Sequence, residues 1–148
     1  MRVLYLILKN YILVSAVVSW MLSQVIKTIL TLISTKRFDT ERIFGAGGMP
    51  SAHSAMVCAL LMGIARKCGP SSPEFALAVA FAAVVMYDAM GVRRAAGEQA
   101  KILNKLVDKW EEDGTEITDK DLKEHLGHKP VEVLAGALLG ILVSLAMA

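Results

Sequence analysis

The sequence has few of the features that mark disulfide-rich or nucleic-acid-binding proteins. Its two cysteines, Cys58 and Cys68, lie ten residues apart in one apolar stretch, which is about 15 Å along a helix and too far for a disulfide. We expect both to be packing residues. The net charge is only +2, basic residues are mixed with acidic ones, and no nucleic-acid-binding motif occurs. We therefore expect no nucleic-acid partner.

Apolar residues, by contrast, are abundant. They make up 55% of the 148 residues, and the mean hydropathy is +0.51. Both values exceed what a soluble core of this size needs. No internal repeat or low-complexity segment divides the chain. We predict an integral membrane protein in which residues 1–148 form a single domain.

Four apolar runs predict the helices of this domain. They lie at residues 11–34, 50–65, 75–92 and 131–148. The first is long enough, at about 1.5 Å per residue, to cross a hydrocarbon core of about 30 Å, and its Lys27 should face protein or water. The second and third are short for spans. The fourth carries Gly136 and Gly140, a spacing that lets two helices approach closely. We predict an all-α, multi-pass bundle of about four transmembrane helices.

A hydrophilic region, residues 93–129, separates the third and fourth runs. Within it, residues 99–110 place their apolar side chains on one helical face. This pattern predicts an amphipathic interfacial helix that either lies on the membrane or packs on the core. Thr118, with Asp121 three residues later, resembles a capping box for a short helix that Gly127 ends.

Two features bear on the placement of the chain in the membrane. The apolar residues 3–8 are interrupted by Lys9 and lack a persuasive cleavage site, so we expect an interfacial lead-in rather than a signal peptide. If all four runs cross, residues 36–49 and 93–129 share one face, which then holds most of the lysines and arginines. The positive-inside rule places that face in the cytoplasm.

A glycine-rich turn, residues 44–49, leads into the second run. Glycines let a backbone approach a ligand closely, and Pro50 suits the first position of a helix. Ser51 and His53 would lie beside the free amides of the first turn, where phosphate binds readily. No Gly-Lys-Ser/Thr follows, so the turn is not a P-loop. A plain loop entering an apolar helix is the alternative.

Residues suited to phosphoryl transfer gather at the helix ends of the same face. They are His53, Asp88, Arg93, Arg94, His128 and Glu132. His128 and Glu132 are four residues apart, which would stack them on one side of a helix. Taken singly, each residue also fits an interfacial anchor or a solvated flank. Taken together, they form the set that phosphoryl transfer through a histidine needs.

Three motifs resemble a known family. Residues 50–53, Pro-Ser-Ala-His, resemble the Pro-Ser-Gly-His motif of the type 2 phosphatidic acid phosphatase superfamily, which is related to the vanadium haloperoxidases. Residues 127–136 resemble its Gly-x-His-x-Pro-x-Asp-Val-x-Ala-Gly stretch. Residues 47–54, 88–99 and 126–133 are closer still to the short, divergent branch of this superfamily. The likeness covers nearly the whole chain.

The resemblance implies roles for the catalytic residues. His128 corresponds to the nucleophile that takes the phosphoryl group, and Glu132 stands where the family has an aspartate that orients it. His53 corresponds to the acid that protonates the leaving oxygen. Alanine replaces glycine at position 52.

The phosphate-binding residues match the family less closely. The family has an arginine six residues before the nucleophile, where this chain has Leu122. An insertion at residues 95–126 would let an arginine from the end of the third run take that role. Asp88 and Glu98 would position these groups without touching the substrate. The phosphate-binding residues that we expect are Arg93, Arg94, Ser51, Arg42 and Lys36.

These observations favour a membrane-embedded phosphatase that hydrolyses a lipid or polyprenyl phosphate through a phosphohistidine, without a metal or other cofactor. A homodimer would complete the core, since many relatives have more spans. Two alternatives remain open. One is a non-catalytic lipid-phosphate binder, and the other is a metal-dependent membrane hydrolase whose ligands are His53, Asp88, Glu98, His128 and Glu132.

Overall fold

The computed structural model describes residues 2–35, 48–112 and 127–147, with side chains except at 35, 92–94 and 108–112. The described part of the chain is helical and contains no strand. Its helices are α1 (Arg2–Lys9), α2 (Tyr11–Thr35), α4 (Ala52–Cys68), α5 (Pro73–Met90), α6 (Val92–Glu112) and α7 (Pro130–Met147). Three segments of the described chain are long and apolar enough to cross a membrane: Tyr11–Ser34, Pro73–Val107 and Pro130–Met147. The all-α membrane bundle predicted from the sequence is confirmed.

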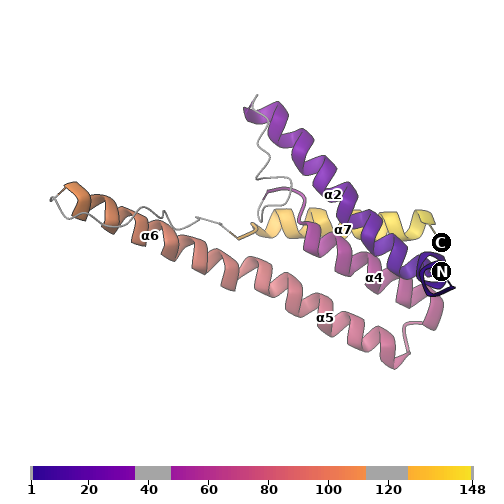
Figure 1. Cartoon of the computed structure of the whole chain (residues 1–148). Helices are drawn as coiled ribbons and strands as arrows, with labels where there is room; N and C mark the ends of the chain where they lie inside the picture. The colour runs from indigo at the N-terminus through magenta and orange to yellow at the C-terminus, as the bar shows by residue number, and fades with distance from the viewer. Residues whose placement is uncertain (1, 36–47, 113–126, 148) are drawn as a thin grey trace.

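α4 is the central helix, and α2, α5 and α7 pack around it (Figure 1). At 17 residues it is about 25 Å long, which is less than a full span. Ser51 caps its beginning, because the Ser51 hydroxyl accepts a hydrogen bond from the Ser54 amide. Gly69 ends it at a positive φ of 87°. The expectation that Pro50 is the first helical residue is wrong, because Pro50 precedes the cap.

α7 lies directly on the backbone of α4. A Cβ atom added at Gly136 would overlap the carbonyl oxygen of Ser51, and one added at Gly140 would overlap that of Ala55. Only glycine allows this approach, so the close packing predicted from the spacing of the two glycines is confirmed. The two helices run in the same direction, since the Arg66 guanidinium donates to the Leu145 carbonyl at their far ends.

α2 turns a polar face towards the bundle. Its buried polar residues recur every fourth position, at Ser15, Ser19, Ser23 and Lys27. The serine hydroxyls donate to carbonyl oxygens of the preceding turn, as Ser19 does to Ser15 at 2.7 Å, so they need no outside partner. At the end of α4, the Tyr11 hydroxyl donates to the Gly63 carbonyl at 2.8 Å.

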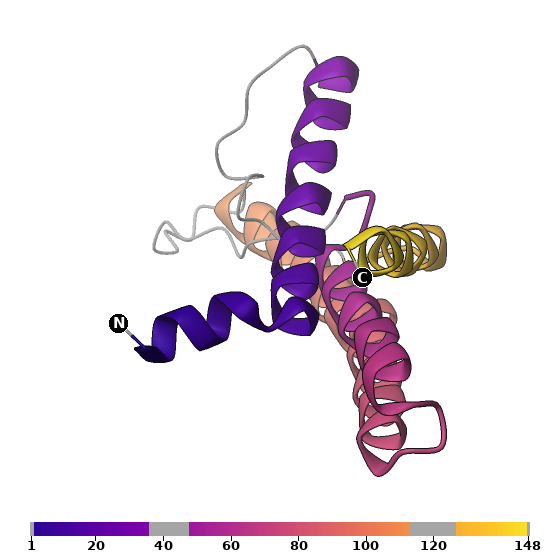
Figure 2. The same cartoon turned by 90° about the vertical axis from the view of Figure 1, so that its right-hand side faces the viewer.

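The two amphipathic segments lie away from this core. α6 continues from α5 after Gly91 and runs out of the bundle (Figure 1), and Ile102, Leu103 and Leu106 are exposed. Among the described helices α6 contacts only α5, and its position on the membrane stays a prediction. α1 turns sharply from the axis of α2 (Figure 2), and its apolar side chains are exposed. Its interfacial position stays a prediction.

The cysteines behave differently from each other. Both are free thiols, as their spacing predicted. Cys58 belongs to the apolar cluster between α4 and α5, beside Val57 and Ala82. Cys68 is exposed at the end of α4, so the prediction that it packs is wrong.

We predict that Gly140→Ala destabilises the protein by about 1–3 kcal/mol, the usual effect of overfilling a packed interior. The added methyl group would press on the backbone of α4 at Ala55, which cannot rotate away. Thermal unfolding in detergent measures the loss. Ala146→Val, on the exposed part of α7, is the control and should change little. Equal stability of the two variants would contradict the close contact.

Candidate functional site

One end of the bundle gathers the beginnings of α4 and α7 and the end of α5. Two backbone hydrogen bonds join these ends. The Ser51 amide donates to the Glu132 carbonyl at 2.9 Å, and the His128 amide donates to the Ala89 carbonyl at 3.0 Å. The convergence of these helix ends, which the sequence predicted, is therefore present in the structure.

His128 is the largest fully buried side chain among the described residues, with 2% of its surface exposed. It lies two residues before Pro130, the first residue of α7. His128 and Glu132 are therefore not stacked along one helix, and this expectation was wrong. The imidazole instead occupies the junction between the end of α5 and the beginning of α7.

Glu132 stabilises the first turn of α7. Its Oε2 atom accepts a hydrogen bond from the Lys129 amide at 3.0 Å, which is how a carboxylate at the third helical position satisfies a free amide. The negative charge also suits a helix N-terminus. The resemblance to the phosphatase superfamily implied that this carboxylate orients His128, and that role stays a prediction.

Ser51 holds the first turn of α4. Its hydroxyl accepts from the Ser54 amide at 3.4 Å and from the Ser54 hydroxyl at 3.0 Å. The side chain is fully buried. Ser51 thus already has a structural task as a cap, beside the phosphate-binding role expected of it.

His53 lies in the first turn of α4 with its side chain exposed. Asp88 is half-buried in the last turn of α5, and Glu98 is exposed on α6. These two acidic residues are therefore on different helices. Because α6 leaves the bundle, the role expected of Glu98 in positioning the site stays a prediction.

The expected arginines and lysine are only partly described. Arg93 and Arg94 lie in the first turn of α6, four and five residues after Ala89, and their side chains are outside the described residues. Lys36, Arg42 and Leu122 lie outside them altogether, as do Thr118 and Asp121 of the predicted capping box. The hydrogen bond from His128 to Ala89 nevertheless brings together the chain on both sides of residues 95–126.

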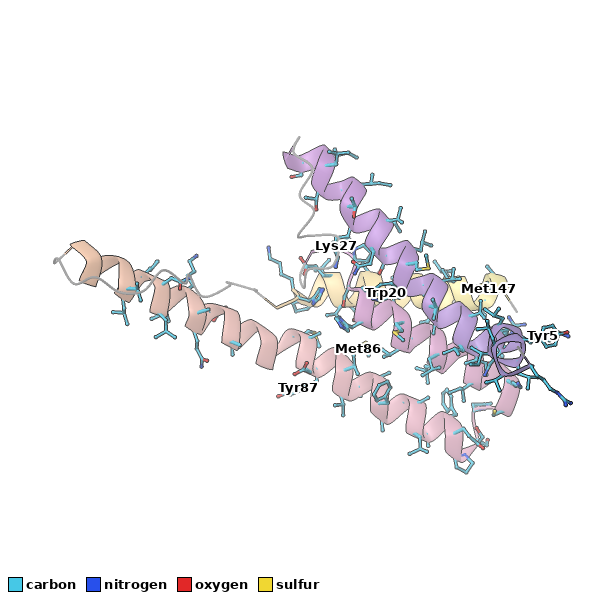
Figure 3. The ribbon with its side chains drawn as sticks, in the orientation of Figure 1. Tyr5, Trp20, Lys27, Met86, Tyr87 and Met147 are labelled. Atoms are coloured by element: carbon cyan, nitrogen blue, oxygen red, sulfur yellow. The ribbon has the colours of Figure 1, made fainter. Side chains whose placement is uncertain are left out.

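Lys27 is a buried residue near this junction that the sequence motifs did not single out. Only 3% of its side chain is exposed, and it lies where α2 passes the beginnings of α4 and α7 (Figure 3). Burial disfavours its charged form, and the charge of Glu132 offsets part of this effect. Its Cγ atom is 3.3 Å from where a Cβ on Gly48 would be, and Gly48 has a positive φ of 83°. The signal was a lone lysine in an apolar run, which predicted that Lys27 faces protein or water but gave no location.

A metal site finds no support in the described part of the chain. No group of three or more histidine, cysteine, aspartate or glutamate side chains there is arranged to hold a metal ion. His53, Asp88, Glu98, His128 and Glu132 are all described, so the ligand set considered from the sequence is not assembled.

Comparisons with known proteins agree with the sequence motifs. Residues 8–143 match the model of a family described as the divergent PAP2 family. A protein of Bacillus subtilis named "Uncharacterized membrane protein YuiD" is 42% identical over 152 residues, which covers 96% of each chain. No solved structure matches.

We predict that Ser51→Ala lowers stability by about 1 kcal/mol, because a helix loses its cap. Ser72→Ala is the matched control, since Ser72 caps α5 by accepting from the Phe75 amide at 3.2 Å. Both variants should unfold at lower temperature. If Ser51 also binds phosphate, only Ser51→Ala should weaken binding of orthovanadate, an anion that mimics a phosphoryl group. Equal vanadate affinity in the two variants would leave Ser51 with its capping role alone.

Proposed function

The chain belongs to the divergent PAP2 family, and from this we propose that it is a membrane-embedded phosphatase for a lipid or polyprenyl phosphate monoester. The observation that carries the proposal is the junction that joins His128 and the carbonyl of Glu132 to the ends of α5 and α4. It combines a histidine nucleophile with two helix N-termini, whose partial positive charges favour a phosphate.

The proposed reaction proceeds in two steps. In the first, a ring nitrogen of His128 attacks phosphorus, and the bond to the lipid oxygen breaks as His53 donates a proton to that oxygen. In the second, water attacks the phosphohistidine while His53 accepts its proton, and inorganic phosphate leaves. The exposure of His53 suits a group that exchanges protons with water. Glu132 would orient His128.

Phosphate binding is assigned to residues around the junction. Arg93 and Arg94 follow closely after Ala89, which holds the His128 amide, so an arginine can approach the nucleophile despite the long intervening segment. A guanidinium suits this role because it binds two phosphate oxygens at once. The proposed phosphate-binding residues are Arg93, Arg94, Ser51, Arg42 and Lys36. Asp88 and Glu98 would position these side chains.

The class of substrate follows from the surroundings of the site. α7 carries exposed apolar side chains immediately beyond the junction, at Val131, Leu134 and Leu138. In a membrane these contact hydrocarbon. A phosphate held at the junction would thus have its attached group next to the bilayer, which favours an apolar tail over a soluble phosphate ester.

The burial of His128 favours a second candidate, a lipid-phosphate binder without turnover. At 2% exposure, the imidazole can reach phosphorus only if neighbouring residues move. Ser51 and Glu132 are also engaged in capping bonds. In this alternative the cations hold a head group and no bond breaks.

The proposal also includes a cytoplasmic orientation of the site and a homodimeric assembly. The lysines and arginines of residues 36–49 and 93–129 favour a cytoplasmic position for this end of the bundle. A homodimer would cover part of the apolar surface of the helices.

The test of the function is phosphate release by the purified protein in detergent, across a panel of lipid and polyprenyl phosphates. EDTA should have no effect, and orthovanadate should inhibit. Release that EDTA abolishes would favour a metal-dependent hydrolase, and binding without release from any substrate would favour the binder.

We predict that His128→Asn abolishes turnover and any acid-labile phosphoenzyme, because the nucleophile is lost. His53→Asn should slow hydrolysis of a lipid phosphate by about a hundred- to ten-thousandfold. It should have a much smaller effect on p-nitrophenyl phosphate, whose leaving group needs no proton. His125→Asn, which changes the third histidine of the chain, is the control and should hydrolyse both substrates as the wild type does. If only His128→Asn were much slower on the lipid phosphate than on p-nitrophenyl phosphate, His128 would be the acid and His53 the nucleophile.

We predict that changing Arg93 or Arg94 to Lys weakens vanadate binding although the charge is kept, because lysine cannot bind two oxygens in a planar fork. Arg66→Lys is the matched control, since Arg66 lies at the far end of α4 and contacts the Leu145 carbonyl. Wild-type affinity in both single variants and in the double variant would exclude the arginines from the site.

A further inference from the structure

Lys27 is exceptional among the charged residues. Among the residues with described side chains, it is the only lysine, arginine, aspartate or glutamate that is buried. It also lies within a segment long and apolar enough to cross a membrane. Moving an ammonium from water into such surroundings is costly unless a partner compensates. Ionisable residues inside membrane spans therefore usually have a functional role.

The surroundings of Lys27 offset part of the cost of burying its charge and fix its position. Burial disfavours the charged ammonium, and the carboxylate of Glu132 acts in the opposite direction. Gly48 lies against the methylene stem, with its Cβ position 3.3 Å from Cγ and 3.4 Å from Cδ. Because Gly48 also has a positive φ, a larger residue there would be strained and would press on the lysine. The described end of the glycine-rich turn thus packs on Lys27.

The negative charge of Glu132 beside a site for an anion indicates a role for this lysine. The N-termini of α4 and α7 favour an anion, but the Glu132 carboxylate in the first turn of α7 would repel one. A cation beside Glu132 removes this repulsion. Lysine suits the task because its ammonium is a compact charge with three donors, which can contact Glu132 and a phosphate oxygen together.

We propose that Lys27 is a phosphate-binding residue of this site, which neutralises Glu132 and contacts the phosphate from α2. This inference rests on the proposed function, because it assigns the phosphate of the substrate to the junction. It adds α2 to the helices that form the site and gives a role to a residue outside the family motifs.

The test measures orthovanadate binding by calorimetry in detergent. Lys27→Met keeps an unbranched side chain of similar length but removes the charge. It should bind vanadate about ten- to a hundredfold more weakly, the usual effect of losing a charged hydrogen bond. Lys27→Arg should retain more affinity than Lys27→Met. Lys105→Met, at an exposed position of α6, is the matched control and should bind as the wild type does.

A purely structural ion pair would also explain some loss, and the double variant separates the two explanations. Removing both charges in Lys27→Met with Glu132→Gln should restore the thermal stability lost in Lys27→Met, because no unpaired charge stays buried. If Lys27 contacts phosphate, the double variant should still bind vanadate more weakly than the Glu132→Gln single variant does, because neither has the repulsion by Glu132 and only the single variant keeps the lysine. Equal affinity of these two variants would overturn the proposal, as would unchanged affinity in Lys27→Met.

The lysine proposal and the proposed function can fail separately. Wild-type protein that binds vanadate through Lys27 but releases phosphate from no substrate would support the lysine and refute the phosphatase. Wild-type protein that hydrolyses a lipid phosphate, with vanadate affinity and KM unchanged in Lys27→Met, would support the phosphatase and refute the lysine. Wild-type protein that neither binds vanadate nor releases phosphate would refute both.

Discussion

The contact between the backbones of α4 and α7 determines the geometry of the whole site. Because Gly136 and Gly140 lack side chains, α7 lies against the carbonyl oxygens of Ser51 and Ala55. This approach brings the first turns of the two helices together, so that the Ser51 amide reaches the Glu132 carbonyl. The Glu132 carbonyl thereby satisfies the Ser51 amide, while the Ser51 hydroxyl and the Glu132 carboxylate each accept from an amide at the start of their own helix. Two positive helix ends come to lie side by side.

The sequence predicted the helices well because their length and hydropathy are set by the membrane rather than by tertiary contacts. It predicted their ends less well. Pro50 suits a first helical position by its φ, but the hydroxyl of Ser51 accepts the Ser54 amide and makes Ser51 the cap. The amphipathic pattern of residues 99–110 could not show whether its apolar face is covered. That depends on where α6 points, and it points away from the bundle (Figure 1).

In the candidate site, too, local sequence patterns predicted some features and missed others. Ser51, His128 and Glu132 were singled out as candidates from motifs, because each lies at a fixed spacing from a proline or glycine that shapes a helix end. Lys27 was not, because no local pattern connects it with Gly48 or Glu132, which belong to distant parts of the chain. The position of Glu132 relative to His128 was also misjudged from spacing alone. Its hydrogen bond to the Lys129 amide arises because α7 begins at Pro130, after His128.

Burial and charge together limit how the junction can work. Lys27 is buried in surroundings of low dielectric constant, where the charge of Glu132 offsets only part of the cost of burying the ammonium, and a phosphate dianion entering beside them would attract this ammonium further. The helix ends and Lys27 can compensate part of its charge, but the dianion needs further cations. These must come from segments that join the helices, because the spans themselves are almost free of charge. The basic residues 36–42 and 93–94 are adjacent to this end of the bundle in sequence. A site of this kind therefore needs both a buried cation that keeps Glu132 neutralised and peripheral cations that accompany the anion.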